Sequence, residues 1–200
     1  MTNYLAAMVA AAALFAGASQ AATPAAGNPA AGNNGPRWVQ APAGGSLDFV
    51  FDQAGAASKG SFKQFTTELG YDEKSPATGS LSVKVQIGTV DTQDQERNEM
   101  LLGADLFDAQ KFPTAQYSAS SFSRSASGGL EAVGKLTLRG VTRDLRLPLK
   151  ITRTAAGLEL SGEAAIKRLD YGVGQGDWKT TEGVGDEVKI QYKVALVKAK

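Results

Sequence analysis

The sequence of 200 residues contains no cysteine and no histidine. Without cysteine, the chain can form no disulfide, no thiolate metal site and no thiol nucleophile. Without histidine, it lacks the imidazole base of many hydrolases and the commonest protein ligand of zinc, haem and copper. Most familiar catalytic centres are therefore excluded before any motif is considered.

The chain also lacks an excess of charge of either sign. Its 21 Lys and Arg residues balance 20 Asp and Glu residues, which gives a formal net charge of +1. Proteins that bind nucleic acid or anionic membrane surfaces concentrate basic charge, so neither partner is indicated. All of these charges fall in residues 37–200, where the charged fraction is that of an ordinary globular domain with a sizeable core.

The N-terminal residues 1–36 carry no charged side chain and divide into two segments. Residues 5–18 form an apolar run that is too short to span a bilayer but fits the core of a secretory signal peptide. We expect a signal peptide over residues 1–21, with cleavage before Ala22. Residues 22–36, rich in Ala, Pro, Gly and Asn, predict a flexible linker. Residues 37–200 are then one exported domain without stable membrane insertion.

Apolar and polar residues alternate through most of this domain, which is typical of antiparallel strands with one wet face. Two looser stretches, residues 58–69 and 114–124, bring the expected number of strands to about eight. Pro148 marks either an edge position or a bulge, because proline cannot donate a ladder hydrogen bond. The clear stretches of period two are residues 46–52, 81–87, 130–139, 145–151, 158–167 and 188–196.

Short joins and one helix connect the expected strands. Because tight hairpins need only a few residues, several strands should follow one another as a meander. A helix is expected within residues 91–108, with Thr92 or Asp94 as its N-cap and Gly103 as its stop. The joins short enough for hairpins are residues 127–129, 139–142 and 155–157.

Eight antiparallel strands with one helical insertion fit two architectures. A β-sandwich packs two inner faces into a solid core, whereas a closed eight-stranded barrel can hold one small ligand inside. The pattern alone leaves both architectures open. Small residues on the apolar face favour the barrel because they would leave room in its interior; these are Ala132, Gly134, Gly162 and Ala164.

Four motifs in the central and C-terminal parts of the chain resemble those of the YceI-like family, and in the family's order they extend over roughly residues 38–198. The first combines an Arg, a Leu and a D-x-F-D ahead of a proline, and the second reads G-x-L-T-L-x-G-V-T. The third is an R-x-D-Y-G turn, and the fourth is V-G-D-x-V before the last strand. The matching residues are Arg97, Leu101, Asp105, Phe107, Asp108 and Pro113; Gly134, Leu136, Thr137, Leu138, Gly140, Val141 and Thr142; Arg168, Asp170, Tyr171 and Gly172; and Val184, Gly185, Asp186 and Val188.

The resemblance implies an all-β, lipocalin-like barrel of eight antiparallel strands with one short helical insertion. It implies a periplasmic protein that is not an enzyme and that holds the long isoprenoid chain of a quinone or a polyprenyl lipid, for transport or storage. That lipid would be the bound ligand, no cofactor or metal is implied, and a homodimer is left open. Side chains expected to line the barrel, each of which could equally fill a core, are Phe49, Phe51, Phe62, Phe65, Val83, Val85, Leu136, Leu147 and Ile190.

Two other classes of function stay open. Asp105 with Asp108, or Glu159 with Glu163, could form the carboxylate pair of a glycosidase-like hydrolase, although the pattern places both pairs on the surface. A non-catalytic envelope-stress or protein-interaction module would also fit, because nothing in the sequence identifies a partner.

Overall fold

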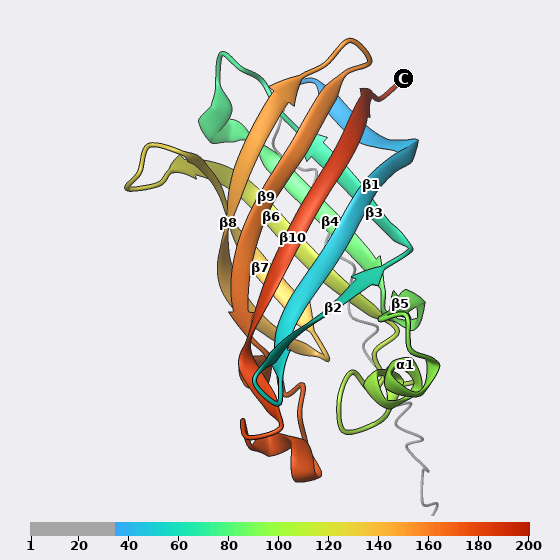
Figure 1. Ribbon diagram of the computed structural model, residues 1–200. Helices are drawn as coiled ribbons and strands as arrows, with labels where there is room; N and C mark the ends of the chain where they lie inside the picture. Colours follow the sequence, from blue (N-terminus) through green and yellow to red (C-terminus); the bar gives the residue numbers. More distant parts are fainter. Residues whose placement is uncertain (1–34) are drawn as a thin grey trace, which may run out of the picture.

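The computed structural model describes residues 35–200 (Figure 1). The predicted signal peptide, residues 1–21, and nearly all of the predicted linker, residues 22–36, lie outside the described residues. Among residues 35–200, no helix is both long and apolar enough to cross a membrane. In chain order the elements are β1 (Arg37–Gln53), β2 (Ala56–Phe62), β3 (Phe65–Gly70), η1 (Pro76–Thr78), β4 (Ser80–Gln86), η2 (Ile87–Thr89), β5 (Val90–Asp91), α1 (Gln95–Leu102), β6 (Thr114–Arg124), β7 (Leu130–Leu138), β8 (Val141–Arg153), β9 (Leu158–Lys167), η3 (Arg168–Tyr171), η4 (Gly176–Lys179) and β10 (Val184–Lys198).

Eight of these strands form a closed antiparallel barrel. They lie side by side in the order β10, β9, β8, β7, β6, β4, β3 and β1, and β1 then pairs with β10 to close the barrel. The barrel expected from the sequence is therefore confirmed, and the sandwich is wrong. The two short strands outside this ring extend the wall at one end, because β2 pairs with β1 and β5 pairs with β2.

The long strand β1 is shared by two partners on one side. Residues 37–39 pair with β3, whereas residues 48–53 pair with β2. The sequence predicted one strand over residues 58–69, and this is wrong because that stretch forms both β2 and β3. The chain breaks between them where the backbone N–H groups of Lys63 and Gln64 donate to Thr89 rather than to β1.

The local signals of the sequence are confirmed. The three expected joins connect β6 to β7, β7 to β8 and β8 to β9 as antiparallel hairpins. At the second join, Arg139 and Gly140 both have positive φ, as a tight hairpin turn requires. The helix α1 begins after Asp94, whose carboxylate accepts a hydrogen bond from the backbone N–H of Arg97, and it ends before Gly103.

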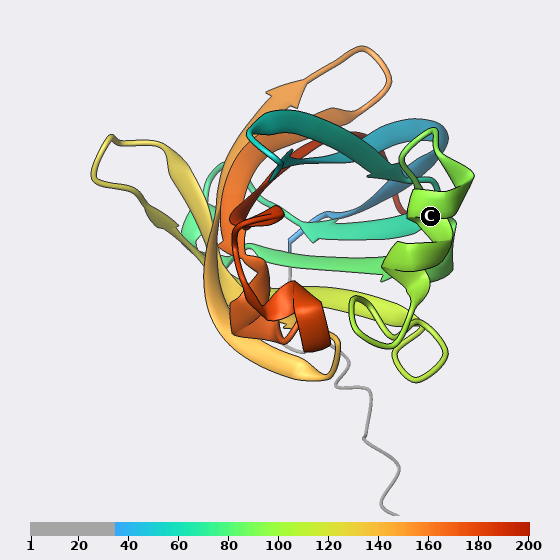
Figure 2. The ribbon, with the colours of Figure 1, turned by 60° about the horizontal axis from the view of Figure 1, so that its bottom comes forward.

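The interior is packed differently at the two ends of the barrel. The end that carries the β8–β9 hairpin, here called the hairpin end, is filled by large buried side chains, among them Leu69, Leu158 and Leu196. The opposite end carries α1, η3 and η4 and is here called the α1 end (Figures 1 and 2). Figure 2 looks along the barrel from the α1 end.

Gly134 and Gly162 were expected to leave empty space in the interior, but tyrosine side chains fill the space beside them. Gly134 lies against the hydroxyl of Tyr117, and a Cβ on Gly162 would collide with the hydroxyl of Tyr192. The tyrosine rings use the space that the missing side chains release, so these glycines bring strands and rings together. This expectation from the sequence is therefore wrong for Gly134 and Gly162, and the interior room lies elsewhere.

The ladder between β8 and β9 has four pairs, which is short beside the six or more of most neighbouring barrel strands; the β1–β3 ladder, with three pairs, is the other short one. It joins residues 150–153 to residues 158–161 and then ends, although β8 begins at Val141 and β9 continues to Lys167. Pro148 pairs with Glu131 of β7. On the side of β9 it has no ladder partner, because the β8–β9 ladder ends at Lys150. Of the two expectations for Pro148, the edge position is the one that the structure confirms.

Candidate ligand-binding cavity

An apolar cavity of about 210 Å³ occupies the interior of the barrel toward the α1 end. Its walls come from the inner faces of the barrel strands together with β2, α1, the loop after α1 and the segment around η3 and η4. An apolar cavity of roughly 150 Å³ is already large enough to stay dry and bind benzene. The space is therefore suited to a hydrocarbon rather than to water.

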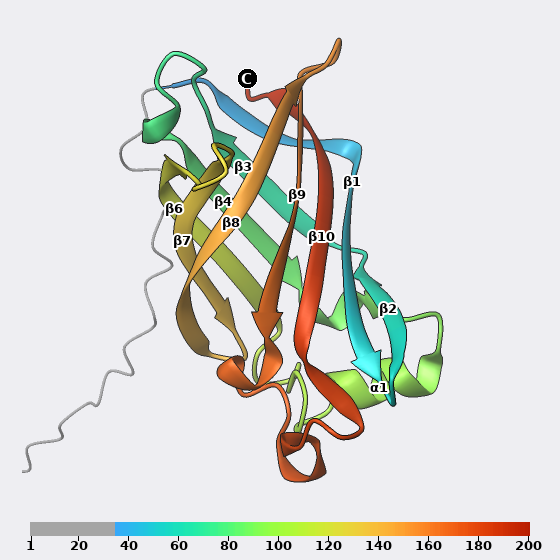
Figure 3. The same cartoon turned by 60° about the vertical axis from the view of Figure 1, so that its left-hand side comes forward.

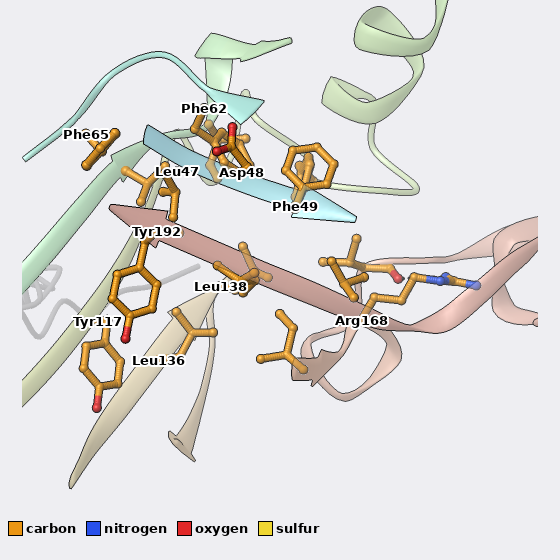
Figure 4. A pocket seen from close by; sticks show the side chains of 18 of the residues that line it. Leu47, Asp48, Phe49, Phe62, Phe65, Tyr117, Leu136, Leu138, Arg168 and Tyr192 are labelled. Carbon is orange, nitrogen blue, oxygen red and sulfur yellow. Dashed lines mark hydrogen bonds between the residues drawn. The ribbon is translucent and has the colours of Figure 1, made fainter. Parts of the chain in front are cut away.

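All nine residues that the sequence singled out as lining candidates do line this cavity. Inward-facing residues alternate along a strand, so a correct period of two places them together once the barrel closes. Figure 4 shows Phe49, Phe62, Phe65 and Leu136 around the space. That these side chains contact a ligand stays a prediction. The nine are Phe49 and Phe51 of β1, Phe62 of β2, Phe65 of β3, Val83 and Val85 of β4, Leu136 of β7, Leu147 of β8 and Ile190 of β10.

Four phenylalanine rings form a continuous group along one wall of the cavity. The ring centroids of Phe49 and Phe51 are 6.0 Å apart, and those of Phe49 and Phe62 are 5.4 Å apart. Phe107, in the loop after α1, extends the group with its ring centroid 5.9 Å from that of Phe62. Because these contacts join β1, β2 and the helical insertion, they hold the insertion against the barrel at the α1 end.

The helix α1 contributes an apolar rim. Leu101 and Met100 line the cavity, and Met100 is the large apolar side chain left exposed among the described residues, with 45% of its surface accessible. The start of the helix is fixed by Asp94 and also by Asn98, whose side-chain oxygen accepts hydrogen bonds from the N–H and the hydroxyl of Thr92. No residue of this short helix is fully buried, so its caps add to the partial packing of Leu101 and Leu102 in holding it.

Arg168 organises the segment that closes the side of the cavity. It is only 4% exposed, and its guanidinium donates five hydrogen bonds of 2.8–2.9 Å, each to a backbone carbonyl. Burial lowers the pKa of Arg168, while nearby Asp186 acts in the opposite direction. The acceptors are the carbonyls of Val173, Trp178, Thr180, Val184 and Gly185.

Two buried tyrosines form the inner part of the cavity wall (Figure 4). The hydroxyl of Tyr117 donates to the carbonyl of Ala132 or of Leu145, at 3.0 and 3.1 Å, and that of Tyr192 donates to the carbonyl of Pro148. Burial raises the pKa of both phenols well above the usual value of 10. Both side chains are therefore neutral at physiological pH and tie the wall strands together.

Sequence reasoning did not identify several residues that shape the cavity. Arg168 was noticed only as part of a turn motif, because nothing in the sequence shows that five carbonyls converge on it. Tyr117 and Tyr192 lie in stretches that the sequence predicted as strands. Their hydroxyl groups lie against Gly134 and Gly162, which belong to other strands, and the sequence gives no signal for these contacts. Met100 of α1, which forms part of the rim, likewise gave no signal, whereas Trp178 of η4, which the sequence predicted as a cap of the barrel mouth or, preferably, as a packing residue, lines the cavity.

The carboxylates considered for a hydrolase do not line this cavity. Asp105 and Asp108 lie in the loop after α1, and Glu159 and Glu163 lie on β9, where their side chains contact Lys193 and Gln191 of β10. Within residues 35–200, no group of three or more Asp and Glu residues is placed to hold a metal ion.

Comparison with known proteins gives a consistent family. Residues 38–196 match the YceI-like domain. A UPF0312 protein of Yersinia enterocolitica is 31% identical over 152 residues, which cover 70% of this chain and 74% of the relative. The crystal structure of BcnA from Burkholderia cenocepacia superposes with a TM-score of 0.72 at 29% identity, covering 75% of this chain and 94% of that one.

A more distant structural neighbour has the same fold. It is a polyisoprenoid-binding domain from Saccharophagus degradans implicated in plant cell wall breakdown. The TM-score is 0.61 at 15% identity, with 82% of this chain and 99% of that chain covered.

Proposed function

Since the chain belongs to the YceI-like family, we propose that it binds the isoprenoid chain of a quinone or a polyprenyl lipid inside its barrel. The observation that carries the proposal is the apolar cavity of about 210 Å³ toward the α1 end, lined by the residues that alternate inward along the strands. The polyisoprenoid-binding domain of Saccharophagus degradans, which has the same fold, supports this choice of ligand.

The chemistry of the cavity favours a chain with few polar groups. Burying one CH₂ group contributes about 0.8 kcal/mol, so a chain of several isoprene units gains many kcal/mol without specific polar contacts. The charged side chains on the cavity wall are Asp48, Arg97 and Arg168, and all N–H groups of the Arg168 guanidinium are already used by carbonyls. The polar part of the lipid then lies toward the rim, near α1.

The cellular role that we propose is a periplasmic carrier or store. The predicted signal peptide over residues 1–21 would export the domain, and an isoprenoid lipid has low solubility in the aqueous periplasm. A binding protein rather than an enzyme is favoured because the paired carboxylates are not among the residues that line the cavity.

The first test is the identity of what the protein carries. Protein purified from its native envelope is measured by native mass spectrometry, and the bound material is then extracted with organic solvent. We expect an added mass that matches a quinone or a polyprenyl lipid. An empty barrel that also fails to take up a long-chain quinone in vitro would refute the proposed function.

The second test fills the cavity with a protein side chain. Leu136→Trp places a larger ring in the cavity, and we expect the affinity for a long-chain ubiquinone to fall at least about tenfold while the protein still folds. Lys135→Trp is the matched control, because Lys135 is the exposed neighbour of Leu136 on β7. Native mass spectrometry with limiting ubiquinone measures the loaded fraction, and equal loading of both variants would contradict the predicted cavity.

A further inference from the structure

The wall of the barrel is not continuous between β8 and β9. Beyond the four paired positions near the hairpin, residues 141–149 of β8 and residues 162–167 of β9 face each other without a ladder. Figure 3 shows the two strands meeting at the hairpin end and separating toward the α1 end. We call this stretch, residues 141–149 with residues 162–167, the β8–β9 seam.

Side chains close the seam instead of backbone pairs. The ring of Tyr192, which comes from β10, lies over Gly162, and its hydroxyl donates to the carbonyl of Pro148 on the other side. Farther along β8, the Nε of Arg143 donates to the carbonyl of Asp170 in η3 at 2.6 Å. Because Pro148 has no N–H, β8 could not donate a ladder hydrogen bond to β9 at this position even if the strands met.

The cavity reaches both flanks of the seam. Leu145 and Leu147 of β8 line it on one side, and Ile166 of β9 lines it on the other. On the inward face of β9 the residues nearest the hairpin end of the seam are small, namely Gly162 and Ala164, whereas Glu163 lies on the outer face, where its carboxylate accepts a hydrogen bond from Gln191. Parting β8 from β9 therefore exposes the cavity without moving a large inward-facing β9 side chain at residues 162–164.

Opening the wall is easier at the seam than between fully paired strands. Separating β9 from β10 would break a ladder that runs from residues 158–167 to residues 187–196. Separating the seam breaks the hydrogen bonds of Tyr192 and Arg143 and no backbone pair. Each broken hydrogen bond carries a free-energy cost, so the seam parts more easily than the fully paired wall between β9 and β10.

We propose that the β8–β9 seam is a side opening through which the isoprenoid chain passes into and out of the cavity. The proposal rests on the proposed function, because the chain is the ligand argued above. A long flexible chain that enters only through the α1 end must slide along its whole length past α1, η3 and η4. A seam that parts lets the chain settle sideways along the wall, with Tyr192 closing over it afterwards.

A disulfide across the seam tests this route. If the register of the β8–β9 ladder continued, Arg146 would stand opposite Ala165, and both side chains are exposed. The variant Arg146→Cys with Ala165→Cys has no other cysteine, since the chain contains none. Its oxidised form holds the two strands within disulfide distance and so prevents parting.

The measurement is the rate of loading and release of a long-chain ubiquinone, followed by quenching of Trp178 fluorescence. We expect the oxidised pair to slow both rates at least about tenfold, to leave Kd nearly unchanged, and to regain the wild-type rates after reduction. The matched control is Ala165→Cys with Lys189→Cys, which links Ala165 to its paired neighbour on β10 instead. Equal rates for the oxidised and reduced seam variants would overturn the proposal and leave the proposed function standing.

A substitution at the closing side chain gives an independent measurement. Tyr192→Phe keeps the ring over Gly162 and removes the hydrogen bond to Pro148, so release should accelerate by roughly three- to tenfold. This variant decides the question if the cysteine pair does not oxidise, and an unchanged release rate then overturns the proposal. If wild-type protein takes up no ubiquinone under any condition, the proposed function fails and the seam proposal falls with it.

Discussion

Arg168 illustrates how a single buried side chain can shape a long irregular segment. Its five hydrogen bonds reach carbonyls between Val173 and Gly185, and the N–H of Leu169 donates to the carboxylate of Asp186. Arginine suits this position because its planar guanidinium presents five donors in fixed directions. The segment around η3 and η4 is therefore held largely by the side chain of Arg168, together with hydrogen bonds such as those from the N–H groups of Gly174 and Gln175 to the carbonyl of Asp105, rather than by a ladder.

The first prediction concerns the replacement of this arginine. Arg168→Lys keeps the charge but provides only three donors from one point, so several buried carbonyls lose their partner. We expect the free energy of unfolding to fall by about 2–4 kcal/mol, measured by urea denaturation. Arg146→Lys is the control because Arg146 is largely exposed, with 64% of its side chain accessible. Equal stability of the two variants would contradict the role given to Arg168.

At the scale of residues, the sequence predicts which side chains face inward but not which partners they meet. Phe49, Val83 and Ile190 could be placed correctly because alternation along one strand decides the face. The contact of Tyr192 with Pro148 joins residues on β10 and β8, and alternation carries no information about it. A single buried arginine likewise gives no periodic signal, since its partners are backbone atoms.

At the scale of elements, α1 depends on its ends. The helix has eight residues and buries none of them fully, although Leu101 and Leu102 are partly buried and pack against the core. Isolated helices of this length are marginal in water, and capping interactions then decide whether the helix forms. Its apolar residues Leu101 and Met100 nevertheless line the cavity, which makes the capping residues relevant to the ligand site.

The second prediction follows from this dependence. Asp94→Ala removes the acceptor for the N–H of Arg97 and should destabilise α1 by about 1 kcal/mol. Hydrogen exchange of the α1 amides should accelerate, while the barrel strands keep their protection. Glu96→Ala is the control, because Glu96 lies in the first turn of the same helix but is not its N-cap residue. Identical exchange in both variants would show that the cap does not hold the helix.

The sequence predicts the strands correctly where they are regular. It fails where one strand, β1, pairs with two different strands along the same edge. Hairpin joins and the cap of α1 are local signals, and all of them could be predicted. The division of residues 58–69 into β2 and β3 could not, because it depends on the backbone of Lys63 and Gln64 meeting Thr89 across the sheet. Similarly, the early end of the β8–β9 ladder depends on Tyr192 and Gly162, which are distant in sequence.

At the scale of the whole molecule, the barrel has a solid half and a hollow half. Large side chains fill the hairpin end, and several of them are almost completely buried. The cavity and the irregular elements α1, η3 and η4 belong to the α1 end (Figure 2). Stability and binding are therefore assigned to different ends of one barrel, which allows the binding end to move while the other end keeps the strands in register.

The last prediction measures this division. In the ligand-free protein, amides of β9 and β10 near Leu158 and Leu196 should exchange most slowly, because both side chains are packed at the solid end. Loading with a long-chain ubiquinone should slow exchange in residues 168–185 and in α1 and should leave the hairpin end nearly unchanged. The ligand stabilises the state that it binds, and its contacts lie at the hollow end. A uniform gain of protection over all strands would instead mean that binding stabilises the barrel only as one cooperative unit, without the separate behaviour of its two ends that the packing predicts.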